Sequence, residues 1–283
     1  MFDRLSRSWQ LVKASGSVLM DDKELLVFPL ISSIATLFVV ACFALPAIGM
    51  GALDGLSVRH GTISTGAYVL GFLFYLCQYF VIFFFNAALV GAAMMRLDGG
   101  NPGVGDGLRI ASSKAGSILG YAFIAATVGM ILRAIQQRVG FIGRIIVGLL
   151  GVSWTMATFL VVPVLVARDV GPVDAVKESA AMLKKTWGEN VIGQAGLGVA
   201  FALIQFSVII CGALLVIAAA FTQNAALIVL TVVLAIAAVI VTALIHSALS
   251  GIYAAALYRY ASDGTPTQGF DPNALQLAFA PKR

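Results

Sequence analysis

Long apolar runs alternate with short polar segments along the whole chain. The runs without a charged residue cover 25–53, 60–95, 115–132, 145–167 and 190–258. A helix needs about 20 apolar residues to cross the hydrocarbon core of a bilayer. The last run is too long for one crossing, and the polar Thr222, Gln223 and Asn224 near its middle predict a turn. The pattern therefore predicts six transmembrane helices.

The polar segments that precede the runs resemble one another. They cover residues 2–24, 104–114 and 172–189. Each has an Asp near its start: Asp3, Asp106 and Asp174, respectively. Asp is a favoured N-cap residue, and the positions after it are spaced as in an amphipathic helix. This internal repeat predicts one transmembrane domain of three hairpins, each preceded by a cytoplasmic amphipathic helix. The repeat units are approximately 1–99, 100–171 and 172–264, with a cytoplasmic tail at 265–283.

The hairpins also end alike. Arg96, Arg168 and Arg259 each come at the end of an apolar run, and an Asp, a Gly and a Pro follow each of them. An Arg here can interact with the helix C-terminus and extend to lipid phosphates, while Gly and Pro end the helix. Within the fourth run, Pro163 predicts a kink, because proline removes a backbone hydrogen bond.

Composition supports an all-α integral membrane protein. Apolar residues make up 60% of the 283 residues and charged residues 11%, whereas soluble domains have about 25% charged residues. Fourteen of the 18 Lys and Arg residues fall on the side of the termini, and the others are Arg59, Arg133, Arg138 and Arg144. The positive-inside rule then predicts a bacterial inner-membrane protein with both termini on the cytoplasmic side. The net charge of +5 fits attraction to membrane lipids rather than to nucleic acid.

The sequence shows no pattern typical of an enzyme. It lacks the His-Glu-x-x-His, Gly-x-Ser-x-Gly, phosphate-loop and Cys-x-x-Cys motifs. All 13 acidic residues lie outside the apolar runs, and Cys42, Cys77 and Cys211 lie singly in three different runs. We therefore expect no catalytic residue, no cofactor and no metal site.

Neutral polar residues within the apolar runs are the candidates for function. They are Gln78, Asn86, Gln205, Thr242, His246 and Ser250. Such residues either hydrogen-bond between packed helices or line a polar cavity. Asn86 and His246 occupy matching places, because the segment 86–91 parallels the segment 246–251. An unpaired polar group in hydrocarbon is costly, so we expect both to point into the bundle.

A second candidate site lies in the segment 133–144. Arg133, Arg138 and Arg144 occur there without an acidic neighbour. They either extend to headgroup phosphates or form an anion or lipid-headgroup site that uses the paired donors of the guanidinium.

Three segments carry a resemblance to known families. They are the segment 174–187, the Ala-Leu-Tyr-Arg-Tyr segment at 256–260 where the last apolar run ends, and an N-terminal part made of 8–13 and 23–32. The chain resembles an uncharacterised bacterial multi-pass inner-membrane protein family, and it is distantly similar to the membrane portion of some glycerophosphodiester phosphodiesterases. This resemblance implies no established activity and no catalytic residue.

Two functions remain open from the sequence. The first is a non-enzymatic inner-membrane protein that interacts with or organises lipids or membrane-protein partners. The alternative is a small transporter or lipid-handling carrier with an internal polar cavity. A cavity that contains Asn86 and His246 favours the carrier, and a dry, tightly packed centre favours the scaffold. The sequence does not determine the oligomeric state.

Overall fold

The described residues of the computed structural model, 15–49, 65–185 and 190–263, are helical apart from short connections, and no strand occurs among them. The elements are η1 (Lys23–Leu26), α2 (Val27–Gly49), α4 (Thr65–Leu97), α5 (Val104–Ser113), α6 (Ala115–Arg138), α7 (Phe141–Ala157), α8 (Val161–Ala167), α9 (Pro172–Lys185), α10 (Asn190–Phe221) and α11 (Ala225–Asp263).

Six stretches are long and apolar enough to cross a membrane. They are Lys23–Pro46, Val69–Leu97, Ala115–Arg138, Phe141–Ala167, Phe201–Phe221 and Ala225–Ser262. Large apolar side chains stay exposed on them, such as Leu37 at 68%, Leu214 at 59% and Leu234 at 59%. Lipid is the solvent that suits such a surface. The expected class is confirmed at this level: the described part of the chain is all-helical and contains six candidate membrane spans.

The polar residues between the apolar runs predicted the turn between α10 and α11 better than the turn between α6 and α7. α10 ends at Phe221 and α11 begins at Ala225, as the polar 222–224 segment predicted. The Asn224 side-chain oxygen accepts from the N–H of Ala226 at 3.0 Å and so caps α11. Between α6 and α7 only residues 139 and 140 are non-helical. Arg and Gln favour helix, so the helix continues through the polar residues until Gly140.

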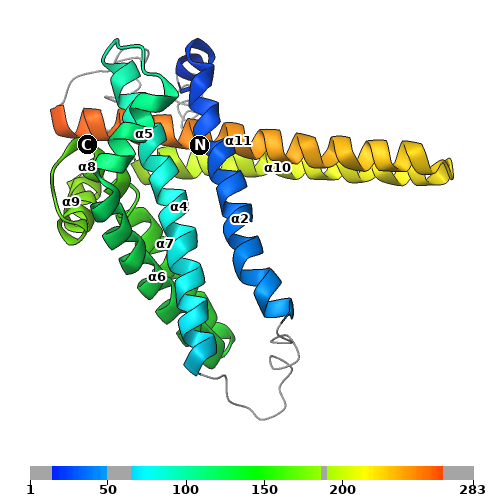
Figure 1. Ribbon diagram of the computed structural model, residues 1–283, viewed down its shortest axis with the longest axis horizontal. Helices are drawn as coiled ribbons and strands as arrows, with labels where there is room; N and C mark the ends of the chain where they lie inside the picture. Colours follow the sequence, from blue (N-terminus) through cyan, green and yellow to red (C-terminus); the bar gives the residue numbers. More distant parts are fainter. Residues whose placement is uncertain (1–14, 50–64, 186–189, 264–283) are drawn as a thin grey trace.

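The hairpins do not all run in the same direction. α2, α4, α6 and α7 extend along one direction, whereas the α10–α11 hairpin crosses them at a steep angle and projects beyond them (Figure 1). The later part of α11 is buried, with Ala248, Ile252 and Ala255 each 0% exposed. The 39 residues of α11 form one continuous helix about 58 Å long, so this buried part fixes the direction of the whole hairpin.

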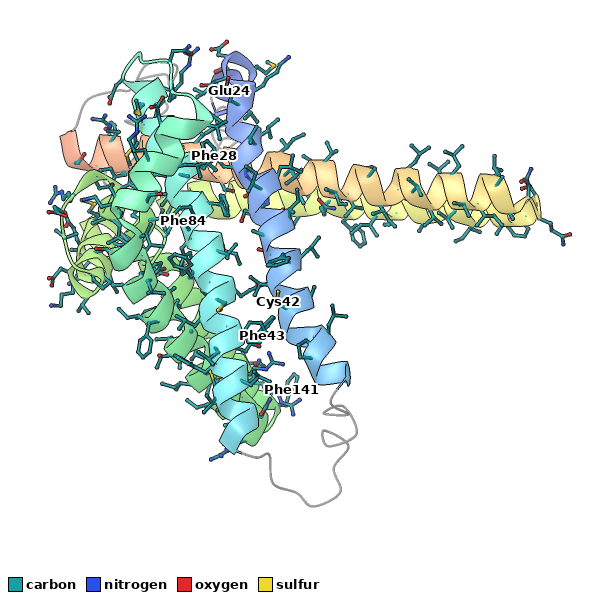
Figure 2. The ribbon with its side chains drawn as sticks, viewed as in Figure 1. Glu24, Phe28, Cys42, Phe43, Phe84 and Phe141 are labelled. Carbon is teal, nitrogen blue, oxygen red and sulfur yellow. The ribbon has the colours of Figure 1, made fainter. Side chains whose placement is uncertain are left out.

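The core lies at the end of the bundle where α2 begins and α4 ends. Glu24 marks this end and Phe141 marks the opposite one (Figure 2), and we call them the Glu24 end and the Phe141 end. α5 packs closely there, because a Cβ on Gly107 would lie 2.5 Å from Phe28 Cζ and 2.7 Å from the Ala88 carbonyl oxygen. Only glycine at position 107 allows α5 to approach α2 and α4 so closely.

Two of the three segments before the hairpins form helices where the sequence placed them, α5 and α9. α9 buries Ala175, Ser179 and Leu183 and exposes Lys177 and Lys184. Residues 2–14 of the first segment, the residue Trp187 and the tail at 265–283 lie outside the described residues, whereas residues 15–21 of that segment are helical. That these helices follow the membrane surface, and that the hairpins form a threefold repeat, stay predictions.

Candidate functional site: a polar pocket at a broken helix

The fourth span is interrupted. α7 ends at Ala157 and α8 begins at Val161. Pro163 has no N–H, and its ring opposes the carbonyl of the residue four positions earlier, Phe159. The helix therefore breaks in the turn before the proline. The sequence predicted a kink at this position, and the structure has a full interruption of the helix there.

Ser179 of α9 joins the two sides of this break. Its hydroxyl donates to the Ala157 carbonyl oxygen at 2.7 Å, and it accepts from the Leu160 N–H at 3.1 Å. Ser179 is 0% exposed. A buried backbone group without a partner costs free energy, so this side chain stabilises a break that would otherwise leave both groups unsatisfied.

The break forms one wall of a cavity of about 350 Å³. Its lining residues come from α2, α4, α11 and the segment around the break: Phe28, Pro29, Ser32, Ile82, Phe85, Asn86, Leu89, Phe159, Pro163, His246, Ser247, Ser250, Gly251 and Ala254. Segments that are far apart in the sequence thus meet around one space. The volume is within the range of small-molecule sites, about 300–1,000 Å³.

Polar side chains of the pocket have unused hydrogen-bonding capacity. Three predicted residues, Asn86, His246 and Ser250, line the pocket together, and so do Ser32 and Ser247. None of these five side chains makes a hydrogen bond within the part of the chain that the structure describes. The His246 ring stacks on Phe201, with 4.7 Å between ring centroids. Sequence reasoning missed the two serines, because serine is common inside membrane helices.

The other predicted polar residues, Gln78, Gln205 and Thr242, are not among the lining residues of this pocket. The Thr242 hydroxyl donates to the Gln205 side-chain oxygen at 2.9 Å, and Gln205 Nε2 donates to the Val239 carbonyl oxygen at 3.5 Å. These bonds join α10 to α11. Gln78 is half-buried on α4, and its side-chain oxygen has no hydrogen-bond partner among the described residues.

The three arginines lie around the α6–α7 turn at the Phe141 end (Figure 2). Arg133 donates to the hydroxyl of Tyr75 on α4. Arg138 and Arg144 are exposed. This position is compatible with both interpretations made from the sequence, contact with headgroup phosphates and a dedicated anion site.

At the Glu24 end, charged residues in the segments where the hairpins end pair with residues of other segments. Arg259 pairs with Asp98, and Arg168 pairs with Glu178 and donates to the Tyr258 hydroxyl at 3.2 Å. Lys114 and Asp169 also pair, with 3.2 Å between nitrogen and oxygen. The repeated exit motif showed that Arg and Asp are present at each exit, but no sequence signal showed that they pair across hairpins.

The pocket lies toward the Glu24 end of the bundle, because Phe28 and Pro29 at the start of α2 line it, and it is partly open. From Asn86 to the end of α4 at Leu97 the helix rises about 16 Å, whereas the start of α2 directly follows η1, which contains Lys23 and Glu24. Phe28 and Leu89 on its inner wall are at most 2% exposed, whereas Ile82 at its rim is 38% exposed. Ser247, also a lining residue, is exposed as well.

Comparison with known families gives one match. Residues 65–270 match the model of a family of unknown function, DUF6159. The matched region contains the pocket walls from α4, the broken fourth span and α11, whereas α2 precedes it. No curated protein matches the chain.

Proposed function

We propose that this chain, which belongs to the DUF6159 family of unknown function, is a non-enzymatic carrier that takes a small molecule or lipid into its pocket. The observation that carries this proposal is the set of five polar lining side chains without a hydrogen bond in the described structure. In an apolar environment such groups need a partner, and a ligand or water supplies it.

The scaffold alternative accounts less well for these residues. A dry interface between helices pairs its polar groups, as Gln205 and Thr242 do within the α10–α11 hairpin. Asn86 and His246 instead border open space. The broken fourth span also supports a carrier, because membrane transporters commonly build their binding sites from discontinuous helices near the bilayer midplane.

The proposal includes a location and an orientation. We place the chain in a bacterial inner membrane, with both termini and the Glu24 end at the cytoplasmic side, because of the Lys and Arg distribution. Arg133, Arg138 and Arg144 then lie near the outer headgroups, where a guanidinium binds phosphate well. A cysteine at position 138 should react with an impermeant reagent from outside, and one at Glu178 only from inside. The reverse pattern would reject the orientation.

The pocket itself is tested by thiol accessibility in a variant that lacks the three native cysteines. Ser250→Cys places a thiol at the pocket lining, and Ala248→Cys places one at a fully buried position outside it on the same helix. A small uncharged maleimide reacts with the thiolate, which forms where water is present. We expect Cys at position 250 to react much faster than Cys at position 248 in lipid vesicles. Equal, slow reaction at both positions would support the dry scaffold instead.

A further inference from the structure

The lining of the pocket combines apolar walls with uncharged polar groups. Phe28, Phe85 and Phe159 contribute aromatic surface, while Asn86 and Ser250 contribute amide and hydroxyl groups. None of the described lining residues is Asp, Glu, Lys or Arg. An amide and a hydroxyl each donate and accept hydrogen bonds without carrying charge.

We propose that the occupant of the pocket is an uncharged single-chain amphiphile, such as a monoacylglycerol. Its head hydrogen-bonds with Asn86, His246 and Ser250, and its hydrocarbon chain lies against the aromatic side chains. This inference rests on the proposed carrier function and adds the chemical class of the cargo.

The charge pattern of the described residues excludes a charged head. Two basic side chains at the Glu24 end are each paired with an acidic one, Arg259 with Asp98 and Lys114 with Asp169. None of them lines the pocket to neutralise a ligand. Placing an uncompensated charge at membrane depth is unfavourable, so a neutral head is the one that this lining accommodates.

The opening of the pocket indicates that the cargo enters from the bilayer. Ile82 and Ser247 are exposed lining residues, and an exposed apolar side chain such as Ile82 on a candidate span suits contact with lipid chains. A molecule that reaches the opening must therefore dissolve in the membrane. An amphiphile does so, whereas a hydrophilic solute such as a sugar does not.

The size of the pocket fits one chain. A cavity of about 350 Å³ corresponds to about twelve water molecules, at roughly 30 Å³ each. It is at the lower end of the range for small-molecule sites. One chain with a small head suits this volume better than the two chains of a phospholipid.

The test uses the Ser250→Cys variant without native cysteines in lipid nanodiscs. Monolaurin, dodecyl phosphate, dodecyltrimethylammonium and dodecane are added separately, and the rate of maleimide labelling is measured. These probes share a chain and differ in the charge or presence of the head. We expect monolaurin to slow labelling several-fold and the other three to leave the rate unchanged. Equal protection by a charged probe or by dodecane, or no protection by monolaurin, would overturn the inference.

Two further variants test recognition of the head. Asn86→Leu removes the amide, and His246→Phe keeps a ring that stacks on Phe201 while removing both nitrogens. Each should abolish protection by monolaurin. Ser33→Ala is the matched control, because the Ser33 hydroxyl bonds to its own helix at Pro29, 2.8 Å away, and lies outside the lining. Protection that persists in both pocket variants would contradict recognition by these side chains.

The outcomes separate this inference from the proposed function. If Cys at position 250 does not react even without a ligand, the pocket is closed, and both proposals fail. If it reacts but monolaurin gives no selective protection, only the assignment of the cargo fails, and the carrier proposal stands.

Discussion

Ser179→Ala tests whether α9 stabilises the broken fourth span. The substitution removes both hydrogen bonds across the break and leaves the Ala157 carbonyl and the Leu160 N–H without this partner. Each buried group left unsatisfied costs about 1–3 kcal/mol. Because Ser179 is fully buried, water does not replace the lost bonds, and we expect the free energy of unfolding to fall by about 2–6 kcal/mol.

Urea unfolding in mild detergent, followed by circular dichroism, measures this loss. Ser153→Ala is the matched control, because Ser153 is exposed on α7 near the break and bonds only within its helix, to the Leu149 carbonyl oxygen at 2.9 Å. The control should change stability by less than about 0.5 kcal/mol. If the two variants lose the same amount of stability, the bridge across the break does not contribute as described.

Three further experiments test the contacts at the Glu24 end. Gly107→Ala should cost about 1–3 kcal/mol in unfolding experiments because of overpacking, whereas Gly105→Ala, with no atom within 4 Å of its Cβ, should be neutral or slightly stabilising; equal losses would contradict this packing. Asp98→Arg and Arg259→Asp should each lower thermal stability by about 0.2–1 kcal/mol and restore it when combined; a double variant less stable than both would reject the pair. Tyr253→Phe should keep or raise stability, because this buried hydroxyl has no hydrogen bond among the described residues; a clear loss would show a missing partner.

Hydropathy predicted the elements of this fold better than their arrangement. Length and the absence of charge were sufficient for six spans, and Thr222 to Asn224 marked a turn because polar groups there can reach water. The direction of the α10–α11 hairpin was not predictable. Both its lipid-facing and its protein-facing surfaces are apolar, so no periodicity shows which face α11 buries against α4.

The candidate site was predictable in part. Asn86 and His246 stood out because amides and imidazoles are rare in apolar runs and occupied matching places. The same reasoning also selected Gln205 and Thr242, which pair with each other, because composition does not distinguish a packed polar group from a cavity-lining one. Ser179 was missed because its role depends on a helix break nineteen to twenty-two positions away in the sequence.

The central claim is that the space beside Asn86 and His246 holds a molecule. Electron cryomicroscopy of the chain in monolaurin-containing nanodiscs, with a bound antibody fragment as a size marker, tests this claim most directly. We predict elongated density in the pocket, with its polar end within hydrogen-bonding distance of the Asn86 side chain. A collapsed pocket, in which Asn86 and His246 hydrogen-bond to neighbouring helices and no density separates α4 from α11, would contradict it.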